Sequence, residues 1–332
     1  MEKKNVKTNQ AIDNSNQQKL VEIQDVSKYF KVSEGMLKAV NHVTLHIMKG
    51  ETLGLVGESG CGKSTFGKVL MGIYQPTHGK ILYHGQKDME INRNTLFSYA
   101  KMAQIIFQDP YSSLDPRMTV GSIIEEGMII HNMYDRAKRK ERIYELLEMV
   151  GLNREHANRF PHEFSGGQRQ RIGIARALAI EPEFIVCDEP ISALDVSIQS
   201  QIINLLHDLQ AKLNLTYLFI AHDLNIVKYI SDRIAVMYLG NIVELATSEE
   251  LYENTLHPYS KALLSAVPIP DPDKEAQKNR HIIIGDVPSP INVPKGCPFV
   301  GRCPYVTDIC GEVKPELEMK QGHPVACHHV DK

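Results

Sequence analysis

The most informative stretch of this sequence is Gly57-Glu58-Ser59-Gly60-Cys61-Gly62-Lys63-Ser64-Thr65. It fits the pattern G-x-x-x-x-G-K-[ST], and it stands after an apolar run at residues 53–56 and before a helical stretch. Glycines in such a loop let backbone N–H groups converge on phosphate oxygens, and the following helix adds the positive end of its dipole. Lys63 can reach the β- and γ-phosphates, and the Ser64 hydroxyl can ligate Mg²⁺. The stretch therefore predicts a nucleotide-phosphate site, against the alternative of a chance glycine-rich turn.

A second motif is an apolar run at residues 184–187 that ends in the acids Asp188 and Glu189. We expect Asp188 to hold Mg²⁺ through water, and Glu189 to polarise the attacking water as general base. Two acids after a strand are often only solvated surface residues. Because the two acids occur in the same chain as the loop at residues 57–65, and follow it in the expected order, the two motifs together indicate a P-loop NTPase.

A third motif, Ser165-Gly166-Gly167-Gln168, follows Phe164 and precedes a clear helical stretch at residues 169–178. A serine and two glycines at a helix start form another anion site, although the same residues can be a simple helix-start turn. Here the motif lies about 20 residues before the acids of the second motif, which favours a functional role.

In this order the motifs resemble the nucleotide-binding subunits of ATP-binding-cassette (ABC) transporters. The resemblance covers residues 21 to about 248, and it includes Gln108 within 107–110, Asp195 within 192–195 and His222 within 221–223. Phe164 replaces the leucine usual at the start of the signature. The resemblance implies an α/β P-loop NTPase fold: a RecA-like core, a β-subdomain and a helical subdomain at about 109–165.

The resemblance also implies the roles of the residues. Two such domains dimerise head to tail around two ATP with Mg²⁺, so residues 165–168 of one face the ATP held by residues 57–65 of the other. Gln108 would contact Mg²⁺ and the attacking water, and His222 would stabilise the γ-phosphate. Asp195 would hold the dimer seam.

The adenine ring is expected to stack on an aromatic residue of the pair Tyr29-Phe30. Spacing slightly favours Phe30 as this ATP contact. Both rings could instead be core residues.

Composition limits the class of protein. The chain has 332 residues, 42% hydrophobic and 23% charged, which suggests about two domains at roughly 150 residues each. A net charge of −3 argues against a protein that binds bulk nucleic acid, which would carry a surplus of basic residues. No apolar run approaches the roughly 18 residues of a membrane span, and residues 1–20 lack the apolar stretch of a secretory signal. We therefore expect a peripheral protein at the cytoplasmic face of a membrane.

The chain divides by composition. Residues 1–19 are predicted to be a disordered tail, rich in Asn, Gln and Lys. Residues 20–250 are predicted to form the ATPase domain, with a strand at 20–26 and helices at 136–150 and 197–213. The proline-rich stretch at 267–273 introduces a predicted C-terminal domain at 251–332.

Residues 257–268 and 285–290, together with 107–117, resemble the F-type (OppF/DppF-like) ATPases of oligopeptide and dipeptide permeases. This implies a heterodimer with a homologous OppD-like ATPase, two separate permease subunits and an extracytoplasmic peptide-binding protein. Related nickel and glutathione importers share this region, so the cargo stays open.

Two other classes are less favoured. A soluble ABC protein on ribosomes or DNA needs tandem cassettes or a long insertion, and residues 108–165 are too short for one. A catalytically silent partner would lack Lys63, Glu189 or His222, and all three are present.

Four cysteines gather near the end of the chain with gaps of 5, 6 and 16 residues: Cys297, Cys303, Cys310 and Cys327. Zinc sites more often use C-x2-4-C pairs. The spacing resembles a four-cysteine motif that holds a structural [4Fe–4S] cluster in some peptide-permease ATPases, and four thiolates suit such a cluster. Zinc and four reduced thiols are the alternatives, and His323, His328 and His329 are further candidate ligands. Cys61 and Cys187 are expected to be inert.

Overall fold

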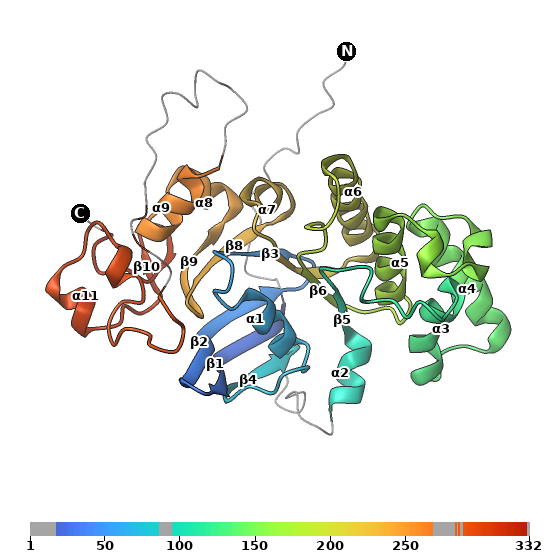
Figure 1. Ribbon diagram of the computed structural model, residues 1–332, viewed down its shortest axis with the longest axis horizontal. Coiled ribbons are helices and arrows are strands. Elements are labelled where there is room, and N and C mark those ends of the chain that lie inside the picture. The colour runs from blue at the N-terminus through green and yellow to red at the C-terminus, as the bar shows by residue number, and fades with distance from the viewer. Residues whose placement is uncertain (1–17, 86–94, 268–282, 284, 286–287, 331–332) are drawn as a thin grey trace, which may run out of the picture.

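A computed structural model describes residues 18–85, 95–267, 283, 285 and 288–330. The predicted tail at 1–19 lies outside these residues except for its last two, and so does all of the proline-rich stretch except Val267. The described chain forms an eight-stranded sheet and a three-stranded sheet with helices packed around them (Figure 1).

The large sheet has the strand order β10-β11-β9-β8-β3-β7-β6-β5. Its strands within residues 52–247 are β3 (Thr52–Val56), β5 (Ala103–Ile106), β6 (Phe184–Asp188), β7 (Thr216–Ile220), β8 (Arg233–Tyr238) and β9 (Asn241–Thr247). Strands β5, β6, β7, β3 and β8 pair in parallel. Every residue of β3, β6 and β7 is buried, because helices cover both faces, and this explains their uninterrupted apolar runs.

Parallel pairing puts the carboxyl ends of neighbouring strands at one edge of the sheet. Four of these ends lead directly into predicted site residues: β3 into the loop at 57–65, β5 into Gln108, β6 into Asp188 and Glu189, and β7 into His222. Ligands of open α/β sheets bind at this edge. The topology therefore assembles the site from segments that are distant in sequence.

The small antiparallel sheet has the order β2-β1-β4, with β1 (Lys19–Val32), β2 (Gly35–Met48) and β4 (His78–Tyr83). It shares a hydrophobic core with α1 (Lys63–Leu70) and one face of the large sheet. The strand predicted at 20–26 is thus the first part of a longer strand.

The remaining helices connect and cover the sheets. They are α2 (Leu96–Met102), α3 (Val120–Ile130), α4 (Arg136–Met149), η3 (Arg154–Asn158), η4 (Pro161–Glu163), α5 (Gly166–Leu178), α6 (Val196–Leu213), α7 (Leu224–Ile230), α8 (Ser248–Glu253), α9 (Pro258–Ser265), η5 (Val300–Arg302) and α11 (Asp308–Glu312). Helices α4 and α6 confirm the two helices predicted from spacing. On α6, Ile202, Leu206 and Leu209 are buried as expected, and Ile198 and Leu205 are half-buried.

The C-terminal residues return to the large sheet. Strands β10 (Glu318–Lys320) and β11 (His323–Val325) extend it, with Val325 opposite Glu244 of β9. The buried Glu244 carboxylate accepts hydrogen bonds from the N–H groups of Leu256 and His257, and it pairs with His323 Nε2 at 2.8 Å. The predicted boundary near residue 250 therefore lies between strands of one sheet.

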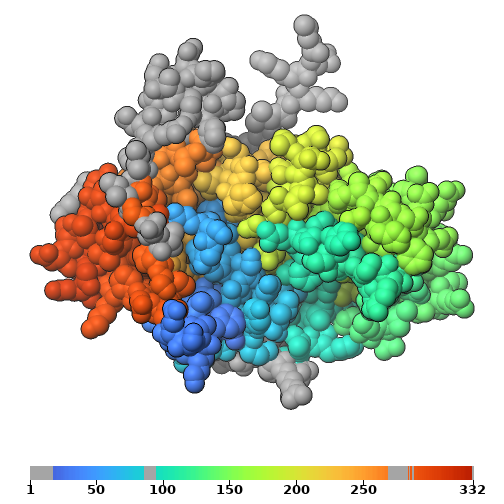
Figure 2. All heavy atoms as spheres, in the orientation of Figure 1, coloured from blue at the N-terminus to red at the C-terminus, as the bar shows by residue number. Residues whose placement is uncertain are grey.

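The C-terminal residues form one end of the molecule, and helices α3 and α4 form the other (Figure 2). Among the described residues, none of the helices has the length and apolar character needed to cross a membrane.

Candidate nucleotide site

The loop at residues 57–65 joins β3 to α1 and is packed against neighbouring backbone. Gly62 has a φ of +112°, and a Cβ there would lie 2.0 Å from the carbonyl oxygen of Ala39. A Cβ on Gly57 would lie 2.2 Å from the carbonyl oxygen of Met237. Any side chain at these positions would push the loop away from the two strands. Gly57 and Gly62 thus have a steric reason as well as a chemical one.

Lys63 lies inside this loop. Its side chain is buried, and Nζ donates to the carbonyl oxygens of Gly57 at 2.8 Å and Glu58 at 3.0 Å. No carboxylate of the described chain pairs with this ammonium group. The loop thus holds a positive charge that a phosphate can compensate.

The predicted Mg²⁺ ligands lie beside Lys63. Ser64 Oγ donates to Asp188 Oδ1 at 2.7 Å. Burial raises the pKa of Asp188, while the bond from Ser64 and the charge of Lys68 lower it. Hydroxyl, carboxylate and amide oxygens are hard ligands that suit Mg²⁺, so the donor set of Ser64, Asp188 and Gln108 fits this ion.

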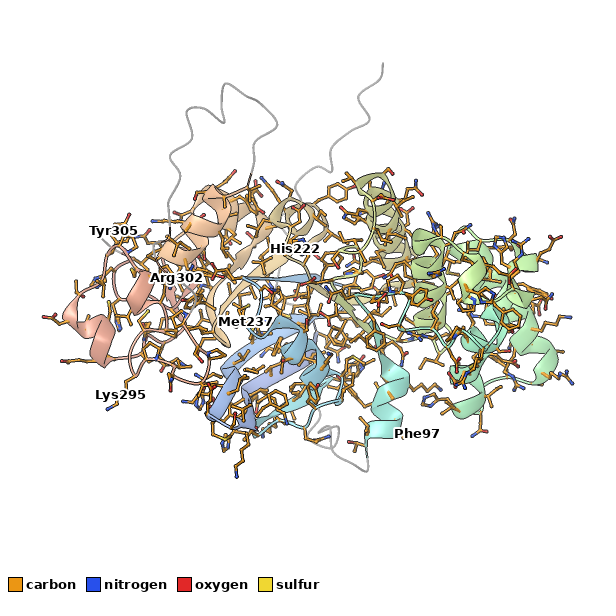
Figure 3. The ribbon with its side chains drawn as sticks, in the orientation of Figure 1. Phe97, His222, Met237, Lys295, Arg302 and Tyr305 are labelled. Carbon is orange, nitrogen blue, oxygen red and sulfur yellow. The ribbon has the colours of Figure 1, made fainter. Side chains whose placement is uncertain are left out.

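Three predicted catalytic residues meet at one carboxylate. Gln108 Nε2 donates to Glu189 Oε2 at 2.8 Å, and His222 Nδ1 lies 3.7 Å from the same oxygen. Figure 3 shows His222 near the centre of the molecule. Glu189 has a φ of +47°, and its N–H donates to the carbonyl oxygen of Ile220. A left-handed backbone is costly for a residue with a side chain and is typical of functional sites.

Lys63, Ser64, Gln108 and Glu189 line one hollow of about 330 Å³, and His222 lines a smaller hollow of about 40 Å³ on another side of Glu189. The rest of residues 59–65 line the larger hollow, together with Lys38, Gly240 and Pro290. Sequence analysis did not identify the last three, because they carry no motif and reach the hollow only through the packing of β2, the β8–β9 turn and the C-terminal residues. The hollow combines a phosphate loop, Mg²⁺ ligands and a candidate base.

Comparisons with known proteins agree with this geometry. The family model for ABC transporters matches residues 40–192, and a model for the oligopeptide/dipeptide transporter C-terminal region matches residues 243–310. The chain is 60% identical over 316 residues to the oligopeptide transport ATP-binding protein OppF of Bacillus subtilis, covering 95% of this chain and 98% of that protein. It is 52% identical over 323 residues to AppF, an oligopeptide transport ATP-binding protein of the same organism, covering 95% and 98%. The chain belongs to the family of oligopeptide-transport ABC ATP-binding proteins. As a member of this family it is an ATPase.

A solved ABC structure shows the same fold. The dimeric ATP-binding cassette MJ0796, bound to ADP and phosphate after hydrolysis, superposes with a TM-score of 0.62 at 29% identity, covering 69% of this chain and 99% of that one. The predicted α/β ABC ATPase fold is confirmed.

The predicted signature, residues 165–168, lies at the start of α5. Ser165 Oγ accepts from the N–H of Gln168 at 3.3 Å, and Gln168 Oε1 accepts from the N–H of Ser165 at 3.0 Å. Ser165 and Gly166 are exposed, and the buried Gly167 packs closely on Ile198 of α6. None of residues 165–168 lines the hollow of its own chain. Asp195 at the start of α6 is also exposed.

The predicted adenine contact lies outside the hollow. The Phe30 ring packs edge-on against Tyr74 at 5.3 Å, with Lys28 Nζ 5.1 Å from its centroid. Tyr29 donates its hydroxyl hydrogen to Asn41 Oδ1 at 2.6 Å. Both side chains are half-buried, so the stacking role of Phe30 stays a prediction.

The four C-terminal cysteines are near one another. Burial raises the pKa of Cys297 to about 11, and the proximity of Cys303, Cys310 and Cys327 adds to the shift. Across the described ranges, no group of three or more His, Cys, Asp or Glu side chains is arranged to hold a metal ion. The donor chemistry suits a cluster, but the side chains as placed do not form a ready ligand set.

The three candidate histidine ligands have different partners in the structure. His329 Nε2 lies 3.4 Å from Cys310 Sγ, and the backbone N–H of His329 donates to Cys327 Sγ. His323 instead pairs with Glu244, and His328 Nε2 contacts the carbonyl oxygen of Val313. Of the three, only His329 lies with the thiols.

Cys61 and Cys187 are buried in the loop and in β6. Burial raises the pKa of both thiols, which keeps them protonated and unreactive, as expected for inert residues.

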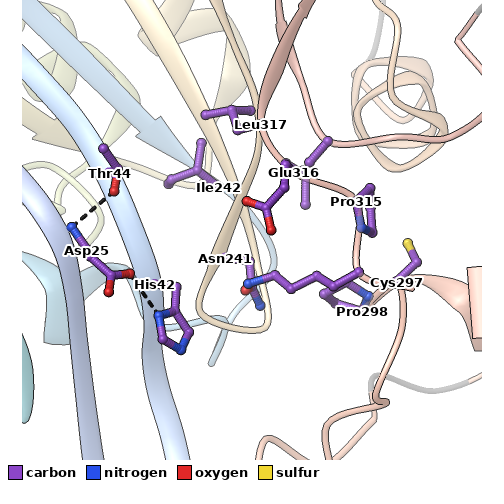
Figure 4. Close-up of a pocket in the computed structure, with 13 residues that line it drawn as sticks. Asp25, His42, Thr44, Asn241, Ile242, Cys297, Pro298, Pro315, Glu316 and Leu317 are labelled. Carbon is purple, nitrogen blue, oxygen red and sulfur yellow. Dashed lines mark hydrogen bonds and ion pairs between the residues drawn. The ribbon is translucent and has the colours of Figure 1, made fainter. Parts of the chain in front are cut away.

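A second hollow, of about 430 Å³, lies between the small sheet, β9 and the C-terminal residues (Figure 4). Cys297 lines it with the charged residues Lys314 and Glu316, and with Asp25, which pairs with His42 at 2.8 Å. It contains none of the predicted nucleotide ligands.

Proposed function

We propose that this chain is the ATP-hydrolysing subunit of a peptide ABC importer, bound peripherally at the cytoplasmic face of the membrane. One observation carries the proposal. Gln108 and His222 contact Glu189 beside the predicted phosphate loop, in a chain that aligns over 95% of its length with oligopeptide transport ATP-binding proteins.

Different residues are proposed to bind the phosphates, hold Mg²⁺ and accept the proton from water. Lys63 and the N–H groups of its loop bind the phosphates. Ser64, Asp188 and Gln108 would hold Mg²⁺, whose positive charge would compensate the charge of the phosphates. Glu189 accepts a proton from water as the water oxygen attacks the γ-phosphorus, and the bond to the β-phosphate oxygen breaks.

Gln108 and His222 support that step. Gln108 donates to the Glu189 carboxylate and so fixes the direction in which the base faces the water. His222 is two-thirds exposed, with 66% of its side chain accessible, so it can reach a γ-phosphate at the open side of Glu189.

Hydrolysis is proposed to require a second cassette. The exposed start of α5 offers N–H groups and a helix dipole to an anion, but it does not face its own chain's hollow. A homologous OppD-like ATPase would bring its phosphate loop to residues 165–168, and Asp195 would line the seam. Closure on ATP and opening after hydrolysis would then move two permease subunits that receive peptide from an extracytoplasmic binding protein.

We also propose that Cys297, Cys303, Cys310 and Cys327 hold a structural [4Fe–4S] cluster, with zinc as the alternative metal. Contacts that link three of the four cysteines support this proposal: the Cys297 N–H donates to the Cys310 carbonyl oxygen, and His329 contacts the sulfurs of Cys310 and Cys327. Metal binding would deprotonate the four thiols and draw them together.

The test uses a complete transporter in proteoliposomes, in which this chain is combined with two permeases, a second ATPase and a peptide-binding protein. We expect ATP-driven uptake of a labelled oligopeptide, and we expect Glu189→Gln to trap an ATP-loaded dimer with little turnover. Asp115→Asn, at an exposed ion pair, is the matched control. Uptake of nickel or glutathione without peptide uptake would refute the cargo, and unchanged hydrolysis in Glu189→Gln would remove Glu189 from the base role.

A further inference from the structure

The C-terminal residues reach the phosphate loop at Glu58. The Arg302 guanidinium donates two parallel hydrogen bonds to the Glu58 carboxylate, from Nη1 to Oε2 at 2.7 Å and from Nη2 to Oε1 at 3.0 Å. Only 7% of the Arg302 side chain is exposed. A bidentate pair of this kind fixes both position and direction of the carboxylate.

A second contact holds the backbone of the same residue. The N–H of Glu58 donates to the hydroxyl oxygen of Tyr259, which lies on α9 and is fully buried. The Tyr259 ring packs with Tyr238 at 4.7 Å and with Phe299 at 5.6 Å. This aromatic cluster orients the hydroxyl, because rings packed in a core have little freedom to turn.

Glu58 also contacts Lys63, the lysine expected to bind phosphate. Its carbonyl oxygen accepts from Lys63 Nζ at 3.0 Å. One residue of the loop is therefore held at its N–H and carboxylate by residues beyond position 250, and it holds Lys63 by its carbonyl. We infer that Arg302 and Tyr259 are positioning residues for ATP, which makes the C-terminal residues a working part of the nucleotide site.

Charge gives Arg302 a second role. Glu58 is an acid in a loop that receives a polyphosphate, and like charges repel. Arg302 neutralises this acid and does not itself line the hollow; Figure 3 shows it on the C-terminal part of the chain, beside the sheet. Without Arg302, an unpaired carboxylate would remain beside the phosphates and the loop would lose an anchor.

The kinetic consequence is specific. Arg302 touches neither the base nor the signature, so its loss should weaken ground-state and transition-state binding of ATP equally. Such a loss raises KM and leaves kcat nearly unchanged. The inference rests on ATP binding by the loop and not on the identity of the cargo.

The test is a double-mutant cycle in the complete transporter, with KM and kcat for ATP and equilibrium binding of a fluorescent ATP analogue as readouts. We expect Arg302→Met to raise KM and Kd by about tenfold or more, with kcat within about twofold. In a Glu58→Gln background the same change should cost much less, because the carboxylate that Arg302 neutralises is gone. Arg117→Met, at an exposed ion pair with Asp115, is the matched control.

Tyr259→Phe tests the second contact and covers the case in which Arg302→Met does not fold. It keeps the buried ring, removes the acceptor of the Glu58 N–H, and should raise Kd for ATP several-fold. Unchanged Kd in Tyr259→Phe, additive effects in the cycle, or a loss of kcat at constant KM would each overturn the inference. Wild-type ATP binding without peptide uptake would refute only the proposed function.

Discussion

Replacing His257 by asparagine should make the stability of this protein less sensitive to acid. His257 is buried at the start of α9, and its Nδ1 accepts a hydrogen bond from the N–H of Tyr259 at 3.1 Å. An imidazole that accepts at Nδ1 is neutral, and protonation of that nitrogen would break the cap of the helix. Because Tyr259 also contacts Glu58, this cap lies close to the phosphate loop.

The magnitude follows from the pKa of His257. Burial lowers the pKa from 6.5 to about 4, against the opposing charge of Glu244. Between these values the unfolded chain binds a proton that the folded chain does not. Above pH 6.5, His257 is neutral in both states and does not lower the free energy of unfolding. As the pH falls from 6.5 towards 4, the unfolded chain gains the proton first and the free energy of unfolding decreases. At about 1.4 kcal/mol for each pKa unit, the loss at pH 4 is about 3 kcal/mol.

The assay is urea unfolding of the full chain at a series of pH values from about 7.5 to about 4. Asparagine can still cap α9 but does not titrate, so His257→Asn should lose about 3 kcal/mol less than wild type over this range. His162→Asn, at an exposed histidine, should keep the wild-type slope. An equal loss of stability in His257→Asn and wild type would refute the reasoning, because the acid sensitivity would then come from other groups.

The remaining predictions concern the phosphate loop and the cysteines. Lys63→Ala should abolish ATP affinity, because it removes the ammonium group and its two hydrogen bonds within the loop; equilibrium binding with circular dichroism as a folding check measures this. Tight ATP binding by a folded Lys63→Ala protein would contradict the proposed phosphate site. Anaerobically purified protein should be brown and contain iron and sulfide, and Cys310→Ser should lower both; colourless protein that contains zinc would replace the cluster by a zinc site.

Local motifs were enough to predict the ABC ATPase family and fold, and to suggest where the nucleotide site lies. The loop at 57–65, the acids Asp188 and Glu189, and the start of α5 each follow from a few neighbouring residues whose chemistry depends on short-range geometry. Burial on both faces makes parallel strands uniformly apolar, which explains the apolar runs before the first two motifs, but the edge of the sheet where the motifs meet came only from the structure.

The tertiary structure decided how the C-terminal residues take part. Arg302 and Glu58 are 244 positions apart, and nothing in the spacing of residues 297–303 encodes that partner. His323 was a candidate metal ligand by sequence, yet the return of β11 to the sheet places it on the buried Glu244. Such contacts depend on where a whole segment packs, and a segment's packing is set by the surfaces of all its neighbours together. The sequence by itself determined an ABC ATPase with a proposed phosphate loop, and only the folded chain showed which distant residues contact that loop.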